Sequence, residues 1–372
     1  MADHERERRV ALLRACDQIL SGVRPLSMAE RLAALPPPPP EAMPDYYGDG
    51  GPVGELEERV AGLLGTEAAA FFVTGTMAQQ VALRIGAEWT GNPAVGLHPL
   101  SHLVRHERDA DMVLSGLRRV HTTDAPRNPV AGEVAGLDEP IGTLVLVLEL
   151  PLRDAGFVLP TWDELTGVVA AARAAGARVH LDGARLWESA YRLGRPLAEV
   201  AGLADTVYVS FYKSLGGISG AALAGPADVV AQARAWRHRY GGQVFQYWPA
   251  ALSALAGLDE ELPRLGRYLD HARTVAAALA AVPGARTFPA PPHTHQFRLW
   301  LPYPPERLRA ANLALAERER RWFASNWEAS DVPGLSVTEI TVAAPALRLD
   351  AAAVTELTER FLAYAARGET PS

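Results

Sequence analysis

Lys213 is the only lysine among the 372 residues of the chain, because 35 of its 36 basic residues are arginines. Lysine is normally among the commonest residues of a protein, so its near absence reflects a compositional bias. A guanidinium group keeps its proton inside a protein, whereas an amine can lose it and act as a nucleophile. Lys213 is therefore a candidate nucleophile. Chance survival is the alternative, and the neighbouring residues must decide between the two.

Lys213 and Asp182 both follow short segments that we predict to be strands. The strand before Lys213 is expected at residues 206–211, and the strand before Asp182 at residues 178–181. A carboxylate at the end of a buried strand is costly unless it has a partner. Asp182 can form a structural ion pair with Arg185, three residues further on. Alternatively, it can keep a ring nitrogen protonated while Arg185 binds a substrate carboxylate.

A third predicted strand, at residues 68–74, turns into a helix through Gly75 and Thr76. Backbone N–H groups at a helix start, with a hydroxyl beside them, bind phosphate; an ordinary threonine cap is the alternative. A phosphate cradle, a carboxylate for a ring nitrogen and an amine for a Schiff base are together the parts that bind pyridoxal phosphate. We therefore expect Lys213, Asp182, Gly75 and Thr76 to bind this cofactor.

The elements that must position these residues alternate between strand and helix. Such alternation indicates a mainly parallel sheet covered by helices, in which ligands bind beyond the carboxyl ends of the strands. The strands are expected at residues 68–74, 93–97, 143–150, 178–181 and 206–211, and the helices at residues 54–64, 77–88, 103–114 and 162–175.

The chain is expected to contain three parts. Residues 1–45 form an N-terminal helical segment, with a helix over 5–35, followed by a linker with five consecutive prolines. Residues 46–260 form the large α/β domain. Residues 261–372 form a smaller α+β domain, with helices at 262–281, 305–323 and 350–366 and strands at 296–301 and 335–343.

The composition excludes several classes of protein. A net charge of -7 leaves no electrostatic footprint for nucleic acid. The single cysteine excludes an internal disulfide framework and a cysteine-built metal site. The longest apolar run, residues 144–148, is too short to span a bilayer, and the charged N-terminus has no signal-peptide core. We expect a soluble, cytoplasmic protein without membrane or nucleic-acid partners.

The motifs and their order resemble the threonine aldolase/β-eliminating lyase family of fold-type I pyridoxal-phosphate enzymes, from about residue 47 to residue 242. The resemblance implies a mainly parallel, seven-stranded type of sheet covered by helices, plus a smaller C-terminal α+β domain. It is carried by Thr-Gly-Thr-Met at residues 74–77, Ser-His at 101–102, His-Leu-Asp-Gly-Ala-Arg at 180–185 and Tyr-Lys at 212–213.

The resemblance assigns a role to each residue on the cofactor side. Lys213 would form the Schiff base with pyridoxal 5'-phosphate, and Asp182 would pair with the pyridine nitrogen. Gly75 and Thr76 would hold the phosphate. His102 would stack on the cofactor ring and serve in proton transfer.

On the substrate side, the resemblance implies that Arg185 contacts the substrate carboxylate and that Tyr47 and Glu107 line the site. It also implies a homodimer or homotetramer with the site at a subunit interface.

The substrate side also departs from the family pattern. The N-terminal Ser-Asp-Thr segment is absent, an arginine of the family is replaced by Phe245, and Thr341 stands where the family has a second arginine for the substrate carboxylate. The arginines that could replace it are Arg153, Arg237, Arg239 and Arg348.

The histidines suggest a function from another class. His98, His102 and His106 recur every four residues beside Glu107, a spacing at which imidazoles on one helix bind zinc. A metal-dependent hydrolase using His102 and His106 is therefore an alternative, although Pro99 interrupts any helix through His98. A structural member of the fold without catalysis is a further alternative, which the retained Lys213 disfavours.

We predict a pyridoxal-phosphate-dependent lyase without a metal. It would cleave a β-hydroxy-α-amino acid to an aldehyde and a glycine-like amino acid, with Lys213, His102 and Asp182 as catalytic residues. β-Elimination, or another amino-acid transformation on the same scaffold, remains the alternative.

Overall fold

The computed structural model describes residues 2–137 and 144–368. Contacts between residues divide the described chain into two compact units, one of residues 34–264 and one of residues 2–33 with 265–368. The N-terminal segment was expected to form a part of its own, whereas in the structure its first 33 residues pack with the C-terminal unit.

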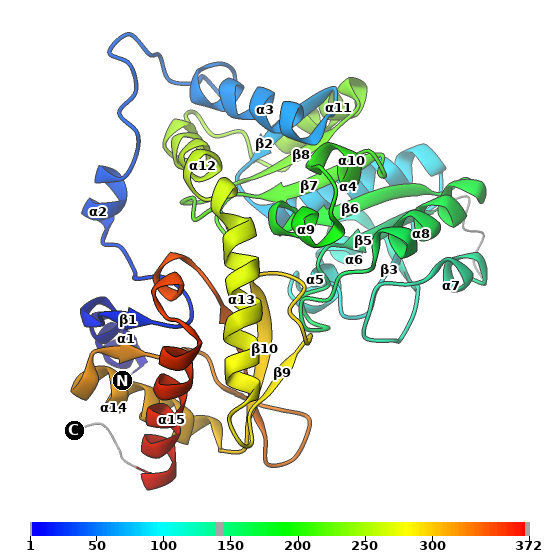
Figure 1. The fold of residues 1–372 in the computed structure, drawn as a ribbon. Coiled ribbons are helices and arrows are strands. Elements are labelled where there is room, and N and C mark those ends of the chain that lie inside the picture. Colours follow the sequence, from blue (N-terminus) through cyan, green and yellow to red (C-terminus); the bar gives the residue numbers. More distant parts are fainter. Residues whose placement is uncertain (1, 138–143, 369–372) are drawn as a thin grey trace. The chain divides into compact units, whose positions relative to one another are not determined.

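The larger unit is built around a seven-stranded sheet with the order β2-β8-β7-β6-β5-β3-β4 (Figure 1). Only β8 runs antiparallel to the rest. The expectation of a mainly parallel sheet is thereby confirmed. The strands are β2 (Ala68–Phe72), β3 (Ala94–Leu97), β4 (Arg118–His121), β5 (Val145–Glu149), β6 (Arg178–Gly183), β7 (Thr206–Ser210) and β8 (Ala221–Gly225).

Helices cover both faces of this sheet, as expected for strands that are buried on both sides. Helix α4 packs against β2, β3 and β5 to β8, and α8 and α9 pack against β6; Figure 1 shows α8 and α9 in front of the sheet. The helices of this unit are α3 (Gly51–Leu64), α4 (Gly75–Thr90), α5 (His102–Arg105), α6 (Ala110–Ser115), α7 (Ala131–Ala135), α8 (Trp162–Ala174), α9 (Leu186–Leu193), α10 (Leu197–Ala201), α11 (Ala227–Arg239) and α12 (Trp248–Glu260).

Several expected elements differ from the structure. The helix expected over 103–114 is wrong: it is split into α5 and α6, because Arg108 and Asp109 have positive φ angles of 52° and 59° that end a helix. Strand β8 was not predicted because its sequence, Ala-Ala-Leu-Ala-Gly, lacks the β-branched residues that favour strands. Strand β4 and helix α7 were also missed; β4 is largely solvent-facing and has no apolar run. Thr143, the first residue of one expected strand, lies outside the described residues.

The second unit has a four-stranded antiparallel sheet with the order β12-β13-β10-β9 and a two-stranded parallel pair of β1 and β11. The single helix expected over 5–35 is wrong, because β1 separates two helices. The elements are α1 (Ala2–Ala15), β1 (Gln18–Ile19), α2 (Met28–Ala33), α13 (Leu265–Ala280), β9 (Arg286–Phe288), β10 (Gln296–Leu301), α14 (Pro305–Glu319), β11 (Arg321–Trp322), β12 (Glu328–Ala329), β13 (Ser336–Thr341) and α15 (Ala351–Arg367).

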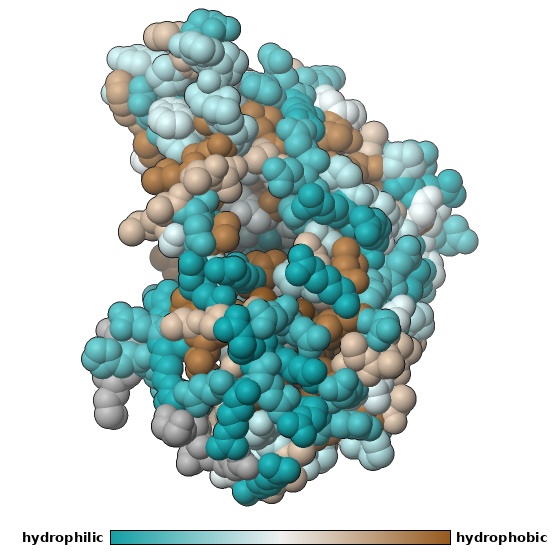
Figure 2. Space-filling view, turned by 60° about the vertical axis from the view of Figure 1, so that its left-hand side comes forward, coloured by the Kyte–Doolittle hydropathy of each residue, from teal (hydrophilic) through white to brown (hydrophobic). Residues whose placement is uncertain are grey.

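No helix within the described ranges is both long and apolar enough to cross a membrane. On the face seen in Figure 2, hydrophobic residues lie scattered between hydrophilic ones.

Candidate active site

Three polar residues form a row across the carboxyl ends of three neighbouring strands. Glu149 on β5 lies opposite Asp182 on β6, and Asp182 lies opposite Tyr208 on β7. Residues paired in this way in a parallel sheet point to the same face. All three side chains are buried. The sheet register therefore assembles a polar row that no single strand contains.

Glu149 connects the end of β5 by hydrogen bonds to two other backbone segments, at His102 and at Arg153. Its carboxylate accepts hydrogen bonds from the backbone N–H of His102, at 2.7 Å, and from that of Arg153, at 3.1 Å. Burial, reinforced by the charge of Asp182, raises the pKa of Glu149 to about 7. Two buried carboxylates so close together disfavour double ionisation. In the protein alone, the pair therefore tends to retain a proton.

Asp182 lies 1% exposed at the end of β6, and one of its oxygens accepts a hydrogen bond of 3.2 Å from the N–H of Ala184. Burial raises its pKa, while the positive charges of Lys213 and His102 oppose that rise. A cation held beside this carboxylate would stabilise its ionised form. Asp182 is thus suited to hold a protonated ring nitrogen.

Lys213 lies in the loop that follows β7. Burial, and after it the charge of Arg185, lowers its pKa to about 8, against the opposing charges of Asp182 and Glu149. An amine with this pKa is neutral in an appreciable fraction of molecules near pH 7–8, as a nucleophile must be. The sequence-based interpretation of Lys213 as a nucleophile is therefore chemically reasonable in this environment.

The N-terminus of α4 begins with the threonine cap that was the alternative to an anion cradle, and it lies beside the hydroxyl of Tyr208. The hydroxyl of Thr74 caps the helix by accepting the N–H of Met77, at 3.2 Å. A Cβ added at Gly75 would lie 2.0 Å from the hydroxyl oxygen of Tyr208, so only glycine lets the helix approach that hydroxyl. Burial raises the pKa of Tyr208 well above its usual range, so its hydroxyl stays protonated and can donate to an anion.

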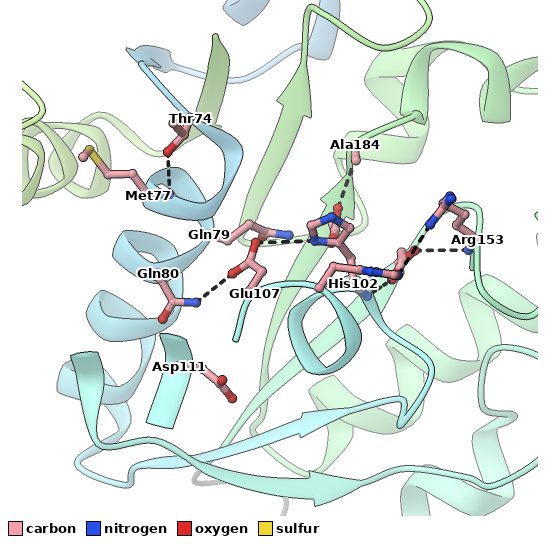
Figure 3. Close-up of polar contacts among 12 residues, drawn as sticks. Thr74, Met77, Gln79, Gln80, His102, Glu107, Asp111, Arg153 and Ala184 are labelled. Atoms are coloured by element: carbon pink, nitrogen blue, oxygen red, sulfur yellow. Dashed lines mark hydrogen bonds and ion pairs between the residues drawn. The ribbon is translucent and has the colours of Figure 1, made fainter. Parts of the chain in front are cut away.

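His102 lies in α5, and its side chain lies beside Glu107 (Figure 3). Its Nδ1 lies 3.5 Å from Glu107, and Glu107 accepts a hydrogen bond of 3.0 Å from the side-chain amide of Gln80 on α4. The side chain of His102 remains 31% exposed, whereas that of Glu107 is 2% exposed. Glu107, which the resemblance places on the substrate side, here contacts and orients His102.

The four arginines that could replace the second carboxylate-binding arginine of the family have different surroundings in the structure. Arg237 is buried and donates a 2.5 Å bond to the carbonyl of Phe71 beside Glu57, and Arg239 lies over the ring of Trp236. Both have structural partners, although the Nε of Arg237, like that of Arg185, is buried and has no hydrogen-bond partner among the described residues. Arg348 belongs to the other unit.

Arg153 and Arg185 are the two arginines whose charges act on Lys213. Arg153 contacts Asp154 at 3.2 Å and His106 at 3.4 Å. The Nε of Arg185 is buried and has no hydrogen-bond partner among the described residues, so it can take an acceptor from a ligand. These two guanidinium groups are the ones suited to bind a substrate carboxylate.

Tyr47 forms an aromatic cluster with Tyr46 and Phe245, with ring centroids 4.9–5.4 Å apart. Its N–H donates to the carbonyl of Phe245, at 2.9 Å, and it has a positive φ of 56°. All three rings are more than 40% exposed. Within the described unit, the contacts of Tyr47 are with this cluster rather than with Lys213 or Asp182.

The histidines do not assemble a metal site. The ring of His98 is bonded to the backbone of Ala125 and Leu100, and His106 is bonded to Asp154 at 2.7 Å. Within residues 2–137 and 144–368, no three His, Cys, Asp or Glu side chains are grouped to hold a metal ion. The hydrolase alternative therefore gains no support.

The residues present fit pyridoxal phosphate. Gly75 and the Tyr208 hydroxyl form a cradle that a Cβ would fill, and Asp182 is a buried carboxylate suited to a protonated ring nitrogen. The amine of Lys213 and the unpartnered Nε of Arg185 lie in the same unit. Gly75, Thr76 and Tyr208 would hold the phosphate, Asp182 the ring nitrogen and Lys213 the aldehyde carbon.

The sequence patterns did not single out two buried residues of this unit, Tyr208 and Glu188. Tyr208 lies within β7, and its one signal in the sequence is a hydroxyl-bearing residue five positions before the only lysine. Glu188 has the sequence signature of an ordinary helical residue, although it is fully buried. The burial and contacts of these two residues appear only in the tertiary structure.

The chain is similar to known proteins of one family. Residues 42–299 match the model of a family described as β-eliminating lyase. An aldolase of Penicillium aethiopicum, vrtJ, is 33% identical over 283 residues, covering 70% of this chain and 69% of the relative. Low-specificity L-threonine aldolase 1 of Arabidopsis thaliana is 26% identical over 239 residues, covering 62% of this chain and 66% of the relative.

Two solved structures are similar over nearly the whole chain. A putative aromatic amino acid β-eliminating lyase/threonine aldolase from Exiguobacterium has a TM-score of 0.87 and 34% identity, covering 97% of this chain and 100% of the other. A putative L-allo-threonine aldolase from Listeria monocytogenes has a TM-score of 0.87 and 29% identity, covering 98% and 99%.

Proposed function

The chain belongs to the β-eliminating lyase family, and from that premise we propose that it is a pyridoxal-phosphate-dependent lyase of the aldolase type. Its substrate is a β-hydroxy-α-amino acid, which it cleaves between Cα and Cβ to an aldehyde and a glycine-like amino acid. The aldolases among its relatives support this function.

The observation that carries the proposal is the placement of Asp182 at the end of β6 and of Lys213 in the loop that follows the adjacent parallel strand β7. A buried amine of lowered pKa and a buried carboxylate within electrostatic reach of each other have little structural use. They suit a cofactor that binds an amine at one end of its ring and a carboxylate at the other.

Bound pyridoxal phosphate would act as an electron sink for the electron pair of the bond that breaks. Lys213 would hold the cofactor through its side-chain amine, and the same amine would be placed to carry a proton. Asp182 keeps the ring nitrogen protonated. Gly75, Thr76 and Tyr208 hold the phosphate at the start of α4.

The substrate is held and deprotonated by residues of the loops. Arg185, with Arg153, binds the α-carboxylate by charge-assisted hydrogen bonds. His102, or a water that it orients, takes the proton from the β-hydroxyl as the aldehyde leaves. Glu107 keeps the imidazole in place through the contact with Nδ1. The aromatic cluster of Tyr46, Tyr47 and Phe245 is suited to line the entrance from a second subunit, in a cytoplasmic homodimer or homotetramer.

The purified chain tests the proposal in two steps. Incubation with pyridoxal phosphate should give a visible absorbance band that the free cofactor lacks, as expected for a conjugated imine between the cofactor and a protein amine. A panel of β-hydroxy-α-amino acids should then release aldehyde and glycine in equal amounts.

Release of ammonia and a keto acid instead would favour β-elimination, the alternative that the family description supports. Absence of both the band and any product would overturn the proposal.

A further inference from the structure

Glu188 on α9 is a buried carboxylate that the mechanism above does not use. Its side chain is 0% exposed. One oxygen accepts a hydrogen bond of 2.6 Å from the hydroxyl of Ser214. The other oxygen, Oε2, is buried and has no hydrogen-bond partner among the described residues. A carboxylate left half-satisfied in this way is costly, so it calls for a function.

The partner of Glu188 is the residue that follows Lys213. The loop around it closes on itself, because the N–H of Gly216 donates to the carbonyl of Lys213, at 3.3 Å, and that of Gly217 donates to Phe211, at 2.9 Å. The Ser214 hydroxyl is a side-chain link from this loop to α9. Glu188 thereby anchors the loop that carries the only lysine of the chain.

The charges of two cations act on Glu188: that of Arg185, at the start of its own helix, and more weakly that of Lys213, in the loop after β7. Burial raises the pKa of Glu188 to about 7, while the Ser214 hydroxyl and these two cations act in the opposite direction. The carboxyl therefore changes its charge near neutral pH. By reciprocity, its ionised form stabilises the Lys213 ammonium, and its protonated form does not.

We propose that Glu188 is a positioning residue for Lys213, which holds the lysine loop through Ser214 and sets by its own charge how readily the lysine amine loses its proton. The role of Lys213 in catalysis rests on the proposed function, whereas the coupling between Glu188 and Lys213 is a property of the protein alone. The two can therefore fail separately.

The single lysine makes a direct measurement possible. The full-length, cofactor-free protein is produced with lysine labelled with carbon-13 at Cε, so that one resonance reports on Lys213 during a pH titration. In the wild type, the resonance should shift with two inflections, one from Lys213 itself and one from the ionisation of Glu188. In Glu188→Gln, the midpoint of Lys213 should fall by at least ~0.3 pH unit, because a negative charge is lost from its surroundings.

Two further variants keep the result interpretable. Ser214→Ala removes the donor that favours ionised Glu188, so the Lys213 midpoint should fall in the same direction by a smaller amount. Glu199→Gln, at an exposed position on α10, should leave the titration unchanged. Ser214→Ala also serves if Glu188→Gln fails to fold, as judged by circular dichroism.

A Lys213 midpoint that is the same in the wild type and the folded variants would overturn the proposal. An equal shift in Glu199→Gln would overturn it too, because the effect would then be a general one of net charge. Neither outcome depends on whether the enzyme is a lyase.

Discussion

Glu149 and Asp182 stand opposite each other on adjacent parallel strands, β5 and β6, with both carboxyl groups buried at the carboxyl end of the sheet. Glu149 accepts hydrogen bonds from the backbone N–H groups of His102 and Arg153, and the charge of Lys213 acts on Asp182. Since the two carboxylates repel each other, the pair tends to retain a proton, and a further cation beside it would favour the ionisation of both.

The pH dependence of stability should reveal this pair. Burial and the charge of Asp182 raise the pKa of Glu149 from an ordinary 4.5 to about 7 in the folded protein. The folded state therefore binds more protons than the unfolded state between these values, and its stability falls as the pH rises through that window. A tenfold change in the proton affinity of one group alters the free energy of unfolding by about 1.4 kcal/mol. Thermal melting of the cofactor-free protein from pH 4.5 to 8 should show this decline.

Glu149→Gln should flatten that decline, although not abolish it, because the raised pKa of Glu188 acts in the same window. The unfolding temperature of the variant at pH 8 relative to that at pH 5 is the quantity to compare. A slope as steep as that of the wild type would show that Glu149 does not carry the shared proton.

Lys213 can be tested with two substitutions. Lys213→Arg keeps the positive charge but not the capacity to lose a proton, so it should be as inactive as Lys213→Ala, with turnover reduced by at least ~1,000-fold. Both should lack the imine absorbance band. Full activity in either variant, with normal circular dichroism, would refute the mechanism.

Gly75 should be needed for cofactor binding. In Gly75→Ala, the new Cβ would lie 2.0 Å from the Tyr208 hydroxyl, so the helix start or the tyrosine must move. The affinity for pyridoxal phosphate, measured by absorbance or fluorescence titration, should fall by about tenfold or more, about 1.4 kcal/mol.

The matched control is Gly54→Ala in α3, where an added Cβ meets no atom within 4 Å. This substitution should leave cofactor affinity unchanged and raise stability by up to about 1 kcal/mol through helix propensity. Equal affinity for pyridoxal phosphate in Gly75→Ala and Gly54→Ala would contradict the assignment of Gly75 to the phosphate site.

Arg153 should contribute to binding the substrate carboxylate. Arg153→Met keeps most of the apolar stem and removes the charge, so KM for the amino acid should rise about tenfold or more, with a smaller change in kcat. Arg195→Met is the control, because Arg195 is also solvent-facing and near a carboxylate, at 3.9 Å from Glu199. If steady-state kinetics show an unchanged KM in Arg153→Met, then Arg153 does not bind the substrate carboxylate and Arg185 alone remains as the candidate.

Much of the cofactor side follows from local sequence signals. Short strand-like segments before Asp182 and Lys213 predict parallel strands, and the carboxyl ends of such strands share one edge of the sheet. The glycine and threonine after β2 mark a strand-to-helix turn. These signals are local because they depend on residue types that are close together in the sequence.

The remaining features depend on contacts between distant residues. The row of Glu149, Asp182 and Tyr208 exists only through strand order and register, which are determined by packing across the sheet. Arg237 is indistinguishable from a substrate arginine in the sequence, and only its burial beside Glu57 and Phe71 gives it a structural role.

In the N-terminal segment, too, the local structure follows from the sequence, whereas the position depends on distant contacts. Its helical pattern is readable, but its place is determined by β1 pairing with β11, some 300 residues further along the chain. The sequence by itself determined the residue types that can bind a cofactor and the strand ends that carry them. The tertiary structure decided which carboxylate faces which amine, because burial and charge act through space between residues that are far apart in the chain.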